Sequence, residues 1–180
     1  TGWTIMKLRV YVFFILNTLI ALAGFYLWLI FLQEMPDRIA VARDAQGAIT
    51  ARVPSKSIWI LPLLFAVIYA IGIFAANAYH KIKFNHKEEF ETIVPEEKRM
   101  PVYTLIQESI FVFVFIMGII IFYIQLTLVL LGLEKINTFS FYPILILFVL
   151  FVLFTALYKK KIDKKAETLI KSSSHGKLND

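Results

Sequence analysis

The chain has no cysteine among its 180 residues, which excludes disulfide bonds, thiolate catalysis and cysteine-ligated metal sites. Charged residues are also few, at 18%, whereas about a quarter is usual for a soluble domain. The sequence contains no Gly-rich phosphate loop, no Ser/His/Asp constellation and no His-Glu-x-x-His pattern. These absences argue against a nucleotide-driven enzyme or pump.

Hydrophobic residues, in contrast, make up 59% of the chain and gather in four long runs. The runs are residues 10–32, 58–79, 109–132 and 139–158. A helix needs about 20 apolar residues to cross the hydrocarbon layer of a membrane, and each run provides them. Because lipid offers no partner for backbone hydrogen bonds, each run must be helical. We therefore predict an all-α fold, an integral membrane four-helix bundle over residues 1–158.

Positive charges are divided unequally between the two sides of this predicted bundle. Fourteen of the 19 Lys and Arg residues fall in the N-terminal flank, residues 80–108 and the tail after residue 158. Since positively charged segments stay in the cytoplasm, we predict a multi-pass protein of the cell membrane with cytoplasmic N and C termini. The net charge of +6 lies beside apolar runs, which favours anionic inner-leaflet lipids over nucleic acid as a partner.

Four residues within the runs are expected to hold the helices together. Asn17 and Gln125 can hydrogen-bond to a neighbouring helix, which contributes roughly 0.6–2 kcal/mol in a membrane. Gly72 and Ala76 have the small-xxx-small spacing that lets two helices approach closely. The alternatives are a substrate-binding role for the two amides and mere helix propensity for the alanine.

Glu108, at the expected cytoplasmic start of the third span, is the candidate for an interface carboxylate. Such a group could bind a cation or relay a proton. The simpler interpretation, which we favour, is a carboxylate in the first helical turn, stabilised by the helix dipole and wetted at the interface.

Two histidines and several carboxylates lie together in the sequence after the second run. His80 and His86 are followed by Glu88, Glu89 and Glu91. The spacing matches no standard set of metal ligands, and on a helix the two histidines would face different sides. We therefore predict no metal, no cofactor and no catalytic residue.

Two further segments are expected in the cytoplasm. Residues 80–108 mix basic and acidic side chains, which suits either a docking surface for a protein partner or a plain solvated hairpin. Their first half should extend the second membrane helix, and Pro95 should interrupt it. In residues 159–180, Ile162, Ala166 and Ile170 recur at helical spacing between lysines, which predicts a basic amphipathic tail lying on the inner leaflet.

The loop after the first run carries the most specific pattern. Pro36 directs the chain away from the membrane, Gly47 permits a turn, and Ser55 or Ser57 can cap the second helix. The pattern reads Met35-Pro36-Asp37-Arg38-Ile39, then Asp44-Ala45-Gln46-Gly47, then Pro54-Ser55-Lys56.

In order and approximate spacing, these residues resemble the outer loop of a bacterial membrane family that includes the SdpI-like immunity proteins. The resemblance covers roughly residues 10–80. Ala40 stands where the family usually has Pro, and Ala42-Arg43 stand where it has His and an aromatic residue, so no metal or catalytic role is transferred. The resemblance implies self-protection against a secreted toxin and signalling to transcriptional regulators.

We therefore expect a non-enzymatic membrane protein that acts as an immunity, sensor or accessory subunit. Its candidates for binding a peptide or protein partner are Pro36, Asp37, Arg38, Gly47 and Lys56. The alternative is a membrane subunit of a transporter, for example of ABC type, whose energy another chain supplies. A third option, an intramembrane enzyme, would have only Glu108 and the two histidines to use.

Overall fold

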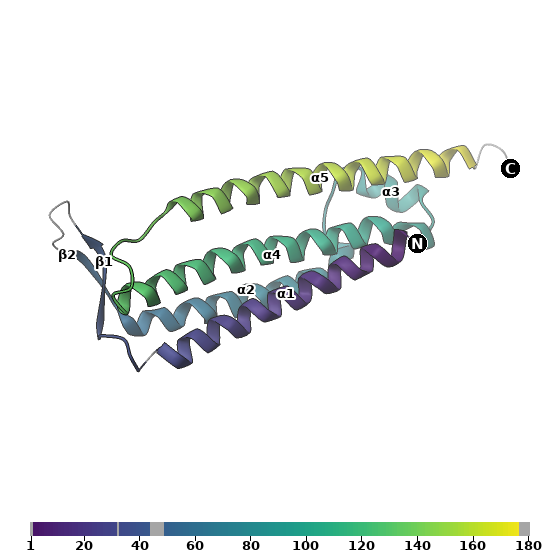
Figure 1. The fold of residues 1–180 in the computed structure, drawn as a ribbon. Helices are drawn as coiled ribbons and strands as arrows, with labels where there is room; N and C mark the ends of the chain where they lie inside the picture. The colour runs from purple at the N-terminus through teal and green to yellow at the C-terminus, as the bar shows by residue number, and fades with distance from the viewer. Residues whose placement is uncertain (1, 32, 44–48, 177–180) are drawn as a thin grey trace.

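In the computed structural model, which describes residues 2–31, 33–43 and 49–176, four long helices make up most of the chain. They are α1 (Gly2–Phe31), α2 (Ile60–Asn77), α4 (Glu96–Gly132) and α5 (Tyr142–Gly176). Each is long and apolar enough to cross a membrane, so the prediction of four membrane-spanning helices is confirmed by length and composition. The start of α1 and the end of α5 lie at the same end of the bundle (Figure 1).

The central helix of the bundle is α4, which packs against α1, α2 and α5. Part of the core at membrane level is formed by Phe65 of α2 with Val114 and Ile121 of α4. Gly118 of α4 makes this contact close, because a Cβ at that position would lie 2.6 Å from the Phe65 ring. The distance between α2 and α4 is therefore set by a small residue facing an aromatic one.

The segment between α1 and α2 forms an antiparallel β-hairpin, so the all-α prediction is wrong there. Its strands are β1 (Arg38–Arg43) and β2 (Ile49–Pro54), and a 3-10 helix, η1 (Ser55–Trp59), leads into α2. Ile39 pairs with Val53, and the register is irregular around Ala42. Alternating β-branched residues favour strands, but runs of six residues are too short for periodicity alone to decide.

A second apolar core lies at the end of the bundle away from the hairpin. Only a single 3-10 turn, η2 (Tyr79–Lys81), follows α2, so the expected extension of the second helix is short. The next helix, α3 (Lys87–Ile93), places Phe90 against Tyr103 of α4 and in one apolar cluster with Ile162 of α5. We call α3, residues 96–106 and residues 159–174 the α3 module.

Pro95 separates α3 from α4, as the sequence predicted. The helix α4 then begins at Glu96 and continues through Pro101, well before the predicted start of the third span. Pro101 is the sixth residue of α4, so the helix loses only one backbone hydrogen bond there, the one to the carbonyl oxygen of Glu97. Arg99 lies in the first turns of α4. Its guanidinium donates to the carbonyl oxygen of Glu91 in α3 and to that of Val94, the residue after α3.

The predicted fourth span and the first part of the tail share one helix, since α5 runs without a break to Gly176. Ile162, Ala166 and Ile170 are buried against α3 and α4. The apolar face of the tail is therefore occupied by a contact within the protein, which corrects the expectation that this face lies on the inner leaflet.

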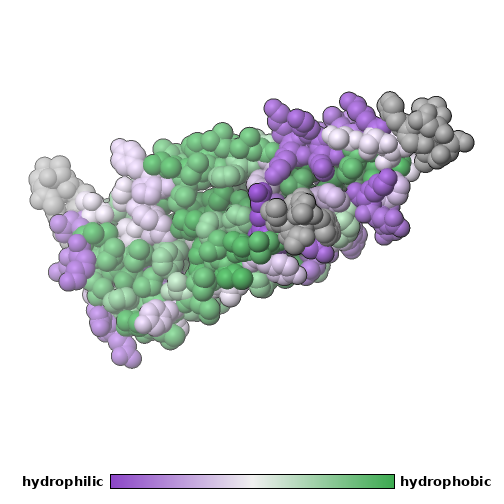
Figure 2. Space-filling model, turned by 45° about the vertical axis from the view of Figure 1, so that its right-hand side comes forward, coloured by the Kyte–Doolittle hydropathy of each residue, from purple (hydrophilic) through white to green (hydrophobic). Residues whose placement is uncertain are grey.

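Exposed apolar side chains cover the middle of the molecule, as expected for a protein that spans a membrane. On the face that it draws, Figure 2 shows an apolar belt across the middle of the molecule and hydrophilic side chains at both ends. The large apolar side chains of α5, such as Phe148, Leu153 and Leu157, are exposed on this belt. A bilayer removes such surface from water, whereas a soluble monomer rarely shows so large an apolar area.

Candidate functional site

The loop between α1 and α2 is closed at its base by hydrogen bonds to one carbonyl group. The Asp37 carbonyl oxygen accepts from the Ser55 backbone N–H at 3.1 Å and from the Ser55 hydroxyl at 3.3 Å. Ser55 is buried, and neither it nor Ser57 caps a helix with its side chain, contrary to the sequence-based expectation. The Pro36-Asp37 and Ser55-Lys56 parts of the sequence pattern are thus joined by hydrogen bonds at the base of the hairpin.

The hairpin is also anchored to the membrane helices. Ile39 of β1 is 1% exposed and packs in a cluster with Ile58 of η1 and Val129 of α4. Gly132 at the end of α4 makes room for Ile39, because a Cβ there would lie 3.3 Å from its side chain. The hairpin therefore has a fixed position on the bundle.

The outward surface of this anchored hairpin is charged. Pro36, Asp37, Arg38 and Lys56 are exposed, as is Arg52, which pairs across the strands with Ala40. Gly47 lies outside the described residues. The exposed side chains combine one carboxylate with three cations, a surface suited to a partner that presents both signs of charge.

The two amides expected to join helices both connect α1 to α4. The Asn17 Nδ2 donates to the carbonyl oxygen of Phe111 at 3.1 Å, and the Gln125 Nε2 donates to that of Gly24 at 2.7 Å. Both side chains are buried. Each therefore forms a hydrogen bond between α1 and α4.

Gly72 and Ala76 lie on the face of α2 that meets α4. A Cβ at Gly72 would approach the Val114 side chain to 2.5 Å, which shows how closely the two helices pass. One turn along, the Ala76 carbonyl oxygen accepts from Gln107 Nε2 at 3.0 Å, and Ala76 itself is buried.

Glu108 is buried within the protein, contrary to the interpretation of a wetted carboxylate in a first turn. It lies about three turns into α4 and is 2% exposed. Its Oε1 accepts from the Tyr158 hydroxyl of α5 at 2.9 Å and lies 3.8 Å from the Arg9 guanidinium of α1. Among the described residues, its Oε2 has no hydrogen-bond partner. The carboxylate thus connects α1, α4 and α5 at one level of the bundle.

The two histidines are not brought together as ligands. His86 Nδ1 lies 3.4 Å from Glu89 on the exposed side of α3, and the His80 carbonyl oxygen accepts from Lys87 Nζ. Within residues 2–31, 33–43 and 49–176, no group of three His, Asp or Glu side chains could hold a metal ion.

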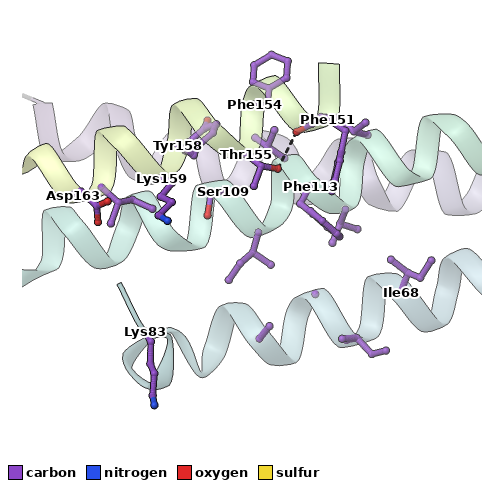
Figure 3. Close-up of a pocket in the computed structure, with 18 residues that line it drawn as sticks. Ile68, Lys83, Ser109, Phe113, Phe151, Phe154, Thr155, Tyr158, Lys159 and Asp163 are labelled. Atoms are coloured by element: carbon purple, nitrogen blue, oxygen red, sulfur yellow. Dashed lines mark hydrogen bonds between the residues drawn. The ribbon is translucent and has the colours of Figure 1, made fainter. Parts of the chain in front are cut away.

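A groove of about 580 Å³, which the sequence does not predict, lies between α2 and α5 (Figure 3). Its floor is α4, which both walls contact, while α2 and α5 scarcely touch each other. The ring centroids of Phe113 of α4 and Phe151 of α5 lie 4.7 Å apart within it. Toward the α3 module the lining becomes polar, with Lys83, Tyr158 and Lys159.

The sequence contains only a weak signal for this groove. Tyr158 followed by three lysines marks the end of a span, and any membrane helix can end in this way. The groove itself depends on how far α5 stands from α2, which is a tertiary property.

Comparison of the chain with protein-family models, with curated proteins and with solved structures found no match. The resemblance to the SdpI-like family therefore stays a prediction from the outer-loop residues.

Proposed function

We propose that this chain is a non-enzymatic protein of a bacterial cell membrane that acts as an immunity, sensor or accessory subunit. Its β-hairpin would recognise a peptide or protein outside the cell, and the α3 module would dock a component inside it. The observation that carries the proposal is the anchored hairpin, whose backbone is fixed by Ile39 and Ser55 while Asp37, Arg38 and Lys56 remain exposed. A fixed charged surface needs little ordering when a partner binds, which favours recognition.

The non-enzymatic part of the proposal rests on where the reactive side chains lie. Glu108 is enclosed between helices and hydrogen-bonded, and His86 lies on the exposed side of α3. General acid–base or nucleophilic chemistry requires such groups within hydrogen-bond reach of one another and of a substrate. Their separation supports a binding role.

We further propose that the α3 module is cytoplasmic and the hairpin external. The support is the excess of Lys and Arg at the α3 end of the molecule. Because the chain has no cysteine, single-cysteine variants test this directly with a membrane-impermeant maleimide. In intact cells, Thr50→Cys in β2 should be labelled and Ser172→Cys in α5 should not; the reverse pattern would contradict the orientation.

The recognition role is tested by cross-linking the protein in native membranes and identifying by mass spectrometry what is recovered with it. The double variant Asp37→Ala with Arg38→Ala should lose the partner, since it removes both charges at the base of β1. A matched control is Glu34→Ala with Lys135→Ala, which removes one exposed charge of each sign outside the hairpin. Equal recovery of the partner with both double variants would contradict recognition by the hairpin.

The same experiment distinguishes the alternative, a transporter subunit driven by another chain. Recovery of an ATPase or permease in a fixed ratio would replace the immunity or sensor role by this alternative. The exposed apolar face of α5 gives the alternative its structural support, because a neighbouring membrane subunit could cover it.

A further inference from the structure

The groove between α2 and α5 is open at the molecular surface, where Ile71, Phe113 and Phe154 of its lining are exposed. Its walls are the facing sides of two helices that both pack on α4, and most of its lining is apolar, for example Ile71, Ile110 and Phe113. At about 580 Å³ it falls within the usual range for ligand sites, roughly 300–1,000 Å³. In a membrane, an apolar groove of this kind has no favourable contact with water, so a hydrocarbon chain is its natural occupant.

One end of the groove differs from the rest because it is cationic. Lys83, after η2, and Lys159, on α5, are exposed members of its lining, and neither forms an ion pair among the described residues. Figure 3 shows both lysines at the same end of the groove as Asp163, with the Lys83 side chain turned away from α5. Near Lys159 the apolar part of α5 gives way to lysine-rich sequence, which is typical of the level of lipid phosphates. Long unbranched side chains at this level can turn toward a headgroup.

The single carboxylate in the lining is already engaged. Asp163 accepts from the Asn85 backbone N–H at 3.3 Å and from the Asn85 Nδ2 at 2.9 Å. These bonds hold the loop that carries Lys83 against α5, so they close the end of the groove. Two lysines against this one carboxylate leave the end of the groove with a net positive charge.

We propose that the groove binds one anionic phospholipid from the leaflet on the α3 side. One acyl chain lies along α4 between Phe113 and Ile71, and the phosphate is held between Lys83 and Lys159. The Tyr158 side chain, which lines the groove, also donates to Glu108, so the bound lipid contacts the residue that ties α5 to α4.

Native mass spectrometry of the purified protein, titrated with dioleoyl phosphatidylglycerol or dioleoyl phosphatidylcholine, tests this site. One phosphatidylglycerol should bind in preference to phosphatidylcholine. Lys83→Gln with Lys159→Gln should weaken that binding by about 25-fold, about 5-fold for each charge removed. Ala75→Phe, which fills the groove, should abolish the binding of both lipids.

Two matched controls separate the site from general effects. Lys164→Gln with Lys165→Gln removes the same charge from exposed positions of α5 outside the groove, and Ala70→Phe adds the same ring to an exposed position of α2. Both should bind phosphatidylglycerol as the unaltered protein does, with circular dichroism unchanged in all variants.

Three results would overturn the proposal. The first is equal affinity for the two lipids, and the second is an equal loss of phosphatidylglycerol binding in the groove and control variants. The third is a protein dimer that Ala75→Phe dissociates, which would identify a second copy of the chain as the occupant. Loss of lipid binding with partner recovery intact would leave the recognition role of the hairpin untouched, so the two proposals fail separately.

Discussion

The helices α4 and α5 have nearly the same length, 37 and 35 residues, and both are apolar enough to cross a membrane. In the most apolar part of α4, 44% of the residues are buried by the protein; in that of α5, none is. The buried helix carries Gly118, Gln125 and Thr127 in this region, whereas the apolar part of α5 consists mainly of Leu, Ile, Val and Phe. In lipid, bulky apolar residues gain little by leaving the hydrocarbon, so small and polar residues select which helix becomes central.

The contrast between α4 and α5 disappears where α5 leaves the apolar belt, because α5 is also buried there. Ile162 is 8% exposed in the α3 module, while Ile146 on the same helix is 60% exposed in the apolar belt. We expect Ile162→Ala to lower the free energy of unfolding by about 3 kcal/mol, because it leaves a cavity in a packed core. Ile146→Ala should change it by less than about 0.5 kcal/mol, because lipid or detergent fills the space. Unfolding by sodium dodecyl sulfate in mixed micelles, followed by tryptophan fluorescence, measures both; equal losses would remove the distinction between the two parts of α5.

The close approach of α2 to α4 offers a second test. Gly118→Leu should destabilise the protein by about 2 kcal/mol, since the new side chain overlaps the buried ring of Phe65. Ala156→Leu, at an exposed position of α5, is the matched control and should have little effect. In the background of Phe65→Ala, the cost of Gly118→Leu should fall, which a double-mutant cycle detects. An unchanged cost in that background would show that the overlap with Phe65 is not the cause.

The attachment of α5 to α4 at membrane level depends on the hydrogen bond from Tyr158 to Glu108. Tyr158→Phe removes this bond to a buried carboxylate and should lower the free energy of unfolding by about 1–2 kcal/mol. The same change at Tyr142, which is 79% exposed at the start of α5, is the control and should have no measurable effect. The same unfolding assay distinguishes them, and a neutral Tyr158→Phe would mean that packing alone holds α5.

The smallest expected effect concerns the polar residues of α4. Gln125→Leu removes a hydrogen bond to α1, and such bonds average about 0.6 kcal/mol in membrane proteins. Thr155→Val in α5 removes only a bond to Phe151 of the same helix and should be near neutral. If replicate unfolding curves give the two variants the same stability, polar bonding does not contribute to the central position of α4.

Much of the helical architecture could be predicted from the sequence, but its boundaries could not. The start of α4 was predicted too late, at residue 109 where the apolar run begins, whereas the helix begins at Glu96 and continues through Pro101. This error moved Glu108 into an expected first turn and hid its burial. The amphipathic face of Ile162, Ala166 and Ile170 was recognised, but periodicity cannot tell whether protein or lipid covers such a face.

The candidate site, too, could be predicted from the sequence only in part. The order of Pro36-Asp37 and Ser55-Lys56 indicated that the loop between the first two helices is informative. Only the structure brings the Asp37 carbonyl to Ser55 and Ile39 to Gly132. The groove could not be predicted, because its lining comes from α2, α4, α5 and the segment after η2, far apart in the sequence.

The sequence by itself determined the number of membrane helices and their approximate extent, because an apolar run of this length must satisfy its backbone as a helix in lipid. Only the tertiary structure decided that α4 is central, that Glu108 is enclosed between three helices, and that α2 and α5 leave a groove. These features depend on contacts between distant residues, and in lipid hydrophobicity alone gives almost no preference among such contacts.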